Sequence, residues 1–174
     1  MTGKNSRTDQ LKFAKYFGHA QGWLLLDKFD LAAEALHEIP SAFQIRPEVV
    51  LFRAHLHMAA EQWTLAEPVL RQLLEESADE PQYWINLAFV VRRAKSLAEA
   101  EVILLEARQR FPAVALIWFN LACYAAQQDR LRDVSELLQE ALRLEPELSA
   151  QAQTDSDLKP YWDGLPSDRP AAPS

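Results

Sequence analysis

The stretch PQYWINLAFVVRRAKSLAEAEVILLEARQRFP, from Pro81 to Pro112, decides the fold. Its apolar and small residues recur at intervals of three and four, which places them on one face of each of two successive helices. Ser96 and Glu99 form a capping-box pattern between the two helices, and Pro112 ends the second one. The residues of the two faces are Trp84, Leu87, Ala88 and Val91, followed by Leu97, Ala100, Leu104 and Ala107.

The same pattern recurs at a step of 34 residues, so that Trp84 corresponds to Trp118 and Pro112 to Pro146. One helix pair cannot cover its own apolar face, and neighbouring pairs therefore have to stack and share a core. The other matching residues of the fourth copy are Asn120, Leu121, Ala122, Leu131, Val134, Leu138 and Ala141. Two earlier copies contribute Pro47, Ala54, Trp63, Ala66, Leu70 and Leu73, and Ala20, Trp23, Phe29, Ala32, Leu36 and Ile39.

This step, with a W-x2-L-A opening, a small residue early in the second helix and a closing proline, resembles the tetratricopeptide repeat of bacterial proteins. The resemblance implies an all-α fold, a right-handed α-α superhelix of about four helix-turn-helix repeats. The repeats would span residues 13–46, 47–80, 81–114 and 115–148. The outer copies depart from the pattern, since His19 and Arg53 stand where leucine is usual.

The two ends of the chain differ from the repeats. We expect a flexible tail over residues 1–8, a helix from near Gln10 capped by Thr8 or Asp9, and an array over residues 9–165. Residues 149–165 would close the stack as a C-terminal cap, with Trp162 as its plug. The other apolar residues of the cap are Leu158, Tyr161 and Leu165. Residues 166–174, rich in Pro, Ala and Ser, are predicted to be disordered.

Local signals also predict details of the first two repeats. Pro40 should stop a helix that begins after Asp30, which leaves residues 41–46 as a long link. Thr64 and Glu67 form a second capping-box pattern. Pro68 follows it directly, so we expect a distorted helix there or one that starts late.

Composition limits the classes of function. A net charge of −7 and few clustered cations disfavour binding to nucleic acid. No apolar run reaches the roughly 20 residues needed to insert into a membrane. The single cysteine, Cys123, excludes an intrachain disulfide, and the N-terminal residues carry no signal-peptide pattern. These features favour a cytoplasmic protein.

No constellation of residues predicts catalysis. His55 and His57 are two positions apart, so they point to nearly opposite sides of a helix and cannot chelate one ion. His57 stands in an apolar slot and is predicted to be packed, as is Cys123. Glycine-rich phosphate loops and nucleophile elbows are absent from the sequence. We therefore expect a protein that is not an enzyme, with no catalytic residue, no metal site and no cofactor.

The resemblance implies a concave face lined by the first helix of each repeat. Its candidate peptide-binding residues are Phe17, Gln21, Leu51, Phe52, His55, Ile85, Asn86, Phe89, Arg92, Phe119 and Asn120. Leu24, Met58 and Cys123 fall on the same slots. In the family, asparagine at the slot of Asn86 often binds a peptide backbone. The lysines and arginine of chaperone-binding members are replaced here by Phe17, Gln82 and Asn86, so chaperone tails are disfavoured.

Several readings of the function remain open at this stage. The leading one is an interaction scaffold whose groove holds a protein or peptide partner, near Phe89 and Asn86. The groove residues would otherwise pack among themselves in a narrow superhelix. The alternatives are a structural protein that assembles as a homodimer, and an accessory chaperone for one client.

Overall fold

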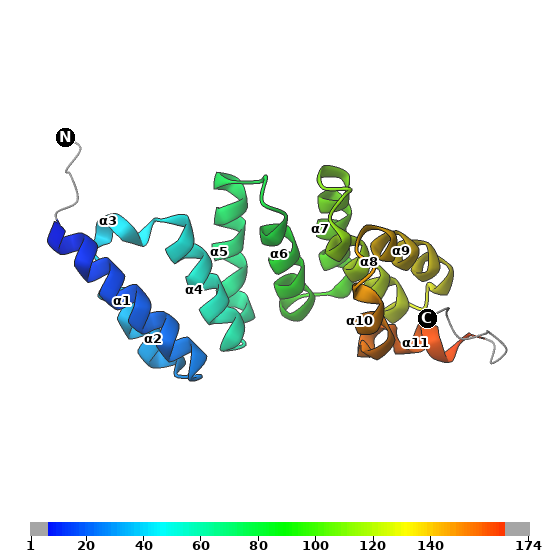
Figure 1. The fold of residues 1–174 in the computed structure, drawn as a ribbon, viewed down its shortest axis with the longest axis horizontal. Helices are drawn as coiled ribbons and strands as arrows, with labels where there is room; N and C mark the ends of the chain where they lie inside the picture. The colour runs from blue at the N-terminus through cyan, green and yellow to red at the C-terminus, as the bar shows by residue number, and fades with distance from the viewer. Residues whose placement is uncertain (1–6, 166–174) are drawn as a thin grey trace. The chain divides into compact units, whose positions relative to one another are not determined.

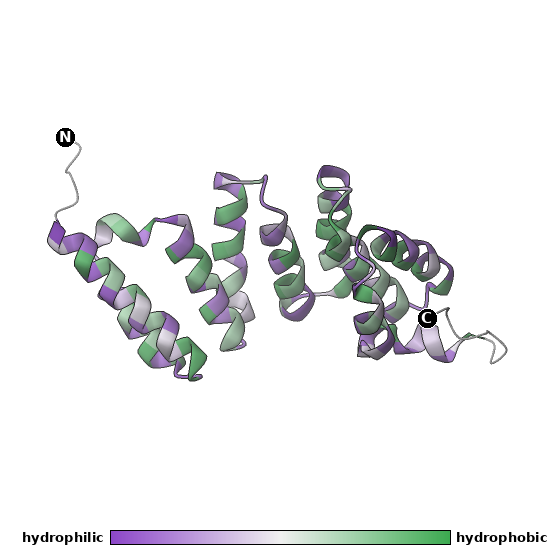
Figure 2. Cartoon of the chain, viewed as in Figure 1, coloured by the Kyte–Doolittle hydropathy of each residue, from purple (hydrophilic) through white to green (hydrophobic). Residues whose placement is uncertain are grey.

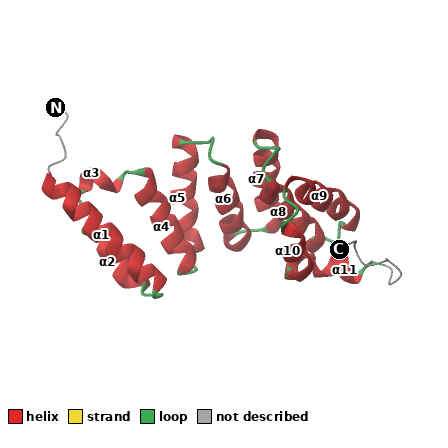
Figure 3. Cartoon of the chain, in the orientation of Figure 1, coloured by secondary structure: helices red, strands yellow, loops and turns green. Residues whose placement is uncertain are grey.

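The computed structural model describes residues 7–165, and over this range the chain is helical and contains no strand (Figures 1 and 3). The predicted disordered tail, 166–174, lies outside the described residues. The long helices are α1 (Arg7–Leu25), α2 (Phe29–His37), α4 (Pro47–Ala59), α5 (Trp63–Glu76), α6 (Pro81–Ala94), α7 (Leu97–Arg110), α8 (Ala115–Gln127) and α9 (Leu131–Leu144). The short ones are α3 (Ser41–Gln44), α10 (Leu148–Thr154), the 3-10 helix η1 (Ser156–Leu158) and α11 (Lys159–Asp163).

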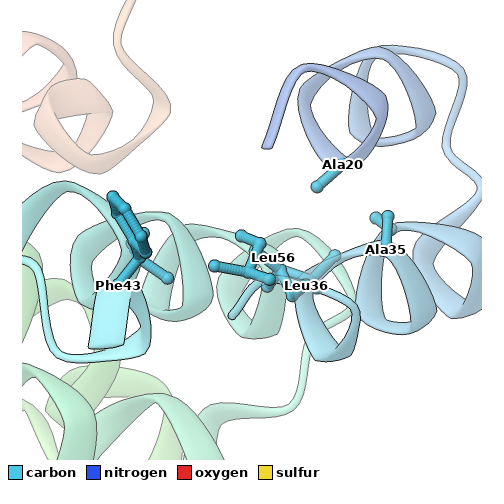
Figure 4. Close-up of a cluster of buried hydrophobic side chains, with 8 residues drawn as sticks. Ala20, Ala35, Leu36, Phe43 and Leu56 are labelled. Carbon is cyan, nitrogen blue, oxygen red and sulfur yellow. The ribbon is translucent and has the colours of Figure 1, made fainter. Parts of the chain in front are cut away.

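The helices belong to two compact units, one that ends at Ser96 and one that begins at Leu97. In the first unit, α1 packs on α2, α2 on α4, α4 on α5 and α5 on α6. Its core includes small residues, such as Ala20 of α1 and Ala35 of α2, beside Leu36, Phe43 and Leu56 (Figure 4). Hydrophilic and hydrophobic residues are mixed along α1 in Figure 2, and Ala20 is the residue of this helix that is buried.

The second unit is built around α8, which packs against α7, α9, η1 and α11. Nine of the thirteen residues of α8 are buried, against one each in α1 and α11. Leu158 of η1 is fully buried, and Tyr161 of α11 is 7% exposed. The Trp162 indole donates to the carbonyl of Ala152 at 2.7 Å. Helices η1 and α11, which lie in the segment predicted to cap the array, therefore pack on α8. That this segment closes the stack stays a prediction.

Three of the turns between paired helices share one backbone geometry at the 34-residue step. Asp27, Glu61 and Asp129 have φ angles of 54°, 55° and 58°. At Glu61 the N–H bonds the Met58 carbonyl at 3.1 Å, and the next N–H bonds the His57 carbonyl at 2.8 Å. This pair of bonds is the Schellman motif, which usually places glycine at the left-handed position.

The third turn breaks this pattern. Lys95, the residue in the same register, has φ −135° and ψ −86°. Its N–H bonds the Val91 carbonyl at 2.9 Å in the ordinary helical way, and α6 continues to Ala94. The four turns of the array thus have two different geometries.

Side-chain bonds also repeat with the array. The Trp84 indole donates to the carbonyl of Ala78 at 2.9 Å, and the Trp118 indole donates to that of Pro112 at 2.8 Å. Each tryptophan thus ties the start of its helix to the preceding loop. Because the two bonds are related by 34 residues, the register read from the sequence is also the register of the structure.

Two expectations about the second repeat are wrong. Helix α5 begins at Trp63, and its N-cap Gln62 makes no side-chain capping bond, so Thr64 and Glu67 do not form a capping box. Glu67 is buried and pairs instead with Lys95 at 2.7 Å and Arg71 at 2.8 Å. Helix α5 also begins at Trp63 and continues through Pro68, so it does not start late. The alternative expectation, a distortion of the helix at Pro68, stays a prediction. Pro68 is exposed, so water can reach the carbonyl that its missing N–H leaves unpaired.

Two boundaries in the first repeat also differ from expectation. Helix α1 begins at Arg7, three residues before the expected start at Gln10. The link 41–46 contains the short helix α3, whose Phe43 is fully buried. The ring of Phe43 gives this segment an apolar anchor, which explains why it is not an extended loop.

Candidate peptide-binding face

The first part of the predicted face is an aromatic cluster on α1 and α4. The rings of Phe17 and Phe52 meet edge to face, with centroids 5.4 Å apart. Phe13 stacks on Phe17 at 5.4 Å and on Phe43 at 5.0 Å. The guanidinium of Arg46 lies 4.2 Å from the centroid of Phe43, within the range of a cation–π contact. Phe17 and Phe52 are half-buried, so this cluster is both core and surface.

The second part is a polar chain that joins α4 to α6. Gln82 Nε2 donates to Asn86 Oδ1 at 2.9 Å, and Asn86 Nδ2 lies 3.2 Å from His55 Nε2. With the amides in this orientation, Asn86 Nδ2 donates and His55 Nε2 accepts, which is the arrangement of a neutral imidazole. Burial also lowers the pKa of His55, which favours the same neutral form.

This chain gives Asn86 a role inside the protein. The residue is only 7% exposed, and each end of its amide makes one hydrogen bond within the protein. Asn86 therefore joins His55 to Gln82, and its binding to a peptide backbone stays a prediction.

The third part surrounds Phe89 of α6. Phe89 is 37% exposed, yet its ring meets the Trp63 ring edge to face at 5.8 Å. The Arg93 guanidinium lies 3.8 Å from the Phe89 centroid and 5.3 Å from that of Trp63. The ring of Phe89 thus contacts two neighbours while the residue remains partly open to solvent.

The other candidate residues divide by unit. In the N-terminal unit Gln21 is exposed, and Leu51, Ile85 and Arg92 are half-buried. Phe119 and Asn120 belong to α8 of the C-terminal unit. Asn120 is half-buried, but Phe119 is only 1% exposed. Phe119 is therefore a core residue and does not line a surface in this conformation. Cys123 is buried, as predicted.

The solved structures of YrrB and MamA are similar to this chain. YrrB, described as a tetratricopeptide protein with an unusual peptide-binding site, matches with a TM-score of 0.65 at 17% identity, over 80% of this chain and 73% of its own. MamA from Desulfovibrio magneticus RS-1, from residue 41 on, matches with a TM-score of 0.65 at 17% identity, over 92% of both chains. The chain has the tetratricopeptide-repeat fold. No protein-family model and no curated protein matches its sequence.

Within this tetratricopeptide array, sequence reasoning missed Trp63 and Arg93 as parts of the face. Arg93 follows Phe89 by four positions, a spacing at which helical side chains touch. That spacing could have indicated the contact. Trp63 begins the preceding helix α5, and its proximity to Phe89 depends on how α5 packs against α6.

The described residues contain neither a group of side chains that could hold a metal ion nor a helix that could span a membrane. Between Arg7 and Leu165 no three His, Cys, Asp or Glu side chains gather as a metal site. In the same range no helix has the length and hydropathy needed to cross a bilayer.

Proposed function

We propose that this protein is a non-enzymatic interaction scaffold that binds an extended or helical peptide segment. The binding face is formed by α1, α4 and α6 of the N-terminal unit. The fold supports this proposal, since the similar structure of YrrB is described as having a peptide-binding site. We also propose a cytoplasmic location, on the composition of the chain.

The single observation that carries the proposal is the setting of Phe89. Binding energy at protein interfaces concentrates in a few aromatic and arginine residues, and rigid anchors lose little entropy on binding. Phe89 is exposed and is fixed between Trp63 and Arg93 before any partner arrives. A ring that served only the core would instead be buried, as Phe119 is.

The charge beside Phe89 indicates the chemistry of the partner. Arg93 covers one part of the ring and is itself exposed, and Arg92 precedes it on α6. A segment with an apolar side chain next to Asp or Glu would contact both the ring and the guanidinium. We therefore infer that the bound segment is acidic and apolar.

A peptide library displayed on phage provides the test. Peptides selected on the wild-type protein are synthesised and titrated against Phe89→Glu and against Val102→Glu. Val102 is a matched control, because it is a 65% exposed apolar residue on α7, outside the proposed face. We expect Phe89→Glu to lower affinity at least about tenfold with an unchanged melting temperature, and Val102→Glu to have no effect. Equal binding by both variants would exclude Phe89 as the anchor.

A second candidate function is self-association, and exposed apolar residues on the first helix pair favour it. Leu25, Leu26 and Leu31 are 86%, 62% and 39% exposed. Exposed apolar groups of this kind mark contact surfaces when they are contiguous. Light scattering on wild type and Leu31→Glu distinguishes the two functions, because a dimer that the variant disrupts would indicate assembly through this end.

A further inference from the structure

A pocket of about 330 Å³ lies between α2, α3 and α4 of the N-terminal unit. Its volume is at the lower end of the range for small-molecule sites. It shares no residue with the proposed peptide-binding face. Its lining residues are Ala33, Leu36, His37, Gln44, Arg53, Leu56 and His57.

Two of the lining residues replace core residues of the repeat. Arg53 stands in the slot of Leu87 and Leu121, which are 2% and 1% exposed. His57 stands in the slot of Val91 and Ala125, which are equally buried. His57, predicted to be packed, is half-buried at this pocket, and its Nδ1 lies 2.8 Å from Gln62 Oε1. The second repeat therefore has cationic and polar groups where later repeats have apolar core.

The guanidinium of Arg53 is held by a neutral group. Arg53 Nη2 donates to Gln44 Oε1 at 2.7 Å. Gln44 Nε2 in turn donates to the carbonyls of Leu36 at 2.5 Å and Ile39 at 3.0 Å, which fixes the amide. A partly buried cation that is oriented by neutral hydrogen bonds keeps its charge available for a ligand.

The pocket lacks the carboxylates that pair with arginines elsewhere. The chain has 25 Asp and Glu against 18 Lys and Arg, and Arg71, Arg130 and Arg143 each pair with a glutamate. None of the lining residues is acidic. His37 Nδ1 lies 3.0 Å from the carbonyl of Ala33 and donates to it, so Arg53 is the group of the lining that can bind an anion.

We propose that this pocket binds a carboxylate attached to a short apolar group. The carboxylate contacts the guanidinium of Arg53, whose planar fork matches its geometry. The apolar group lies against Ala33, Leu36 and Leu56. A free small acid and the C-terminal residue of a peptide both have this chemistry.

The test follows amide resonances in ¹H–¹⁵N spectra of the full chain during titration. The probes are hexanoate, its neutral analogue hexanamide, and the peptide acetyl-Gly-Gly-Leu with a free or an amidated C-terminus. We expect saturable shifts around Gln44 and Arg53 with hexanoate, at the roughly millimolar affinity that so small a ligand reaches. Hexanamide should produce none. Tighter binding of the free-acid peptide than of hexanoate would identify a chain terminus as the source, and the reverse would identify a small acid.

Variants separate this site from nonspecific charge effects. Arg53→Leu restores the apolar residue of the repeat and should stay folded, while hexanoate affinity falls at least about tenfold. Arg132→Leu, which removes the same charge from an exposed position of α9, should bind as the wild type does. Equal shifts with hexanamide, full binding by Arg53→Leu, or displacement of hexanoate by equimolar inorganic phosphate would overturn the proposal.

Discussion

The left-handed turn residues allow a stability prediction with an internal control. Glu61 adopts φ 55° at the Schellman position after α4, where the residue is exposed. A residue with a Cβ pays about 1–2 kcal/mol for this conformation, and glycine does not. Glycine also makes the unfolded chain more flexible, which costs about 0.4–1 kcal/mol. Glu61→Gly should therefore stabilise the protein by a net of about 0.5–1 kcal/mol.

Lys95 provides the matched control, because it has the same place in the repeat but φ −135°. Lys95→Gly relieves no left-handed strain, increases the entropy of the unfolded chain and removes the contact with Glu67. It should destabilise the protein by roughly 1–2 kcal/mol. The two glycine substitutions thus have opposite signs.

Thermal unfolding monitored by circular dichroism measures both effects. For a chain of this length, Glu61→Gly should raise the melting temperature by about 1–4 °C and Lys95→Gly should lower it by a similar or larger amount. Glu61→Ala should not stabilise, since alanine keeps the Cβ. A fall in melting temperature for Glu61→Gly, or equal changes at the two sites, would refute the assignment of strain to the backbone.

Four further outcomes are expected. Glu67→Gln should lower the free energy of unfolding by about 1–2 kcal/mol at pH 7 in thermal melts, because it leaves two part-exposed cations without their buried partner. Burial raises the pKa of Glu67, but the bonds from Lys95 and Arg71 lower it overall. Wild-type stability should therefore fall as pH drops through this pKa, and the variant should not show that dependence. Because burial lowers the pKa of His55, the protein should lose stability as pH falls from the usual histidine pKa through the lower pKa of the folded state. NMR titration of the His55 ring should show a pKa closer to the usual value in Asn86→Ala, which removes a side chain that lies against the ring. Ala122→Leu should overpack a fully buried site and cost about 1–3 kcal/mol in denaturant unfolding. Leu158→Ala should cost about 2–4 kcal/mol and increase hydrogen exchange in α8, which Leu158 covers.

Much of the fold follows from periodicity alone. The 34-residue step and the spacing of three and four predicted the helix pairs, since every repeat has to bury the same face. Trp84 and Trp118 kept their register because each ties its helix to the loop before it. The burial of Leu158 and Tyr161 was also predictable, because they are large apolar residues that follow the last repeat.

The glutamate at position 67 shows where local patterns fail. Its spacing from Thr64 fits a capping box, and nothing nearby in the sequence indicates a partner 28 residues away. The competing contact with Lys95 forms only when α5 packs on α6. The ion pair of Glu67 with Lys95 is therefore more stabilising than a capping bond at the start of α5 would be. Glu101 has the same slot one repeat later and also pairs with a later cation, Arg130.

The candidate face was predicted by slot but not by accessibility. Phe119 corresponds in the repeat to residue 85, four positions before Phe89. The sequence does not indicate how much of either phenylalanine is covered. Phe119 is covered because α8 packs with α7, α9, η1 and α11, whereas Phe89 remains partly open to solvent. Burial at a slot therefore depends on the neighbours of each helix, which the repeat pattern does not contain.

Departures from the repeat are more informative about function than its matches. A leucine in the slot of residue 53 would be expected from stacking alone, and it would need no partner. The arginine found there reaches Gln44 of α3, a helix that has no counterpart between the later repeats. The extra helix and the charged residue are therefore explained together, because α3 supplies the amide that keeps a part-buried guanidinium hydrogen-bonded. The helix α3 and Arg53 together replace apolar packing with polar groups at one place in the array. Selectivity for a ligand can arise at these polar groups.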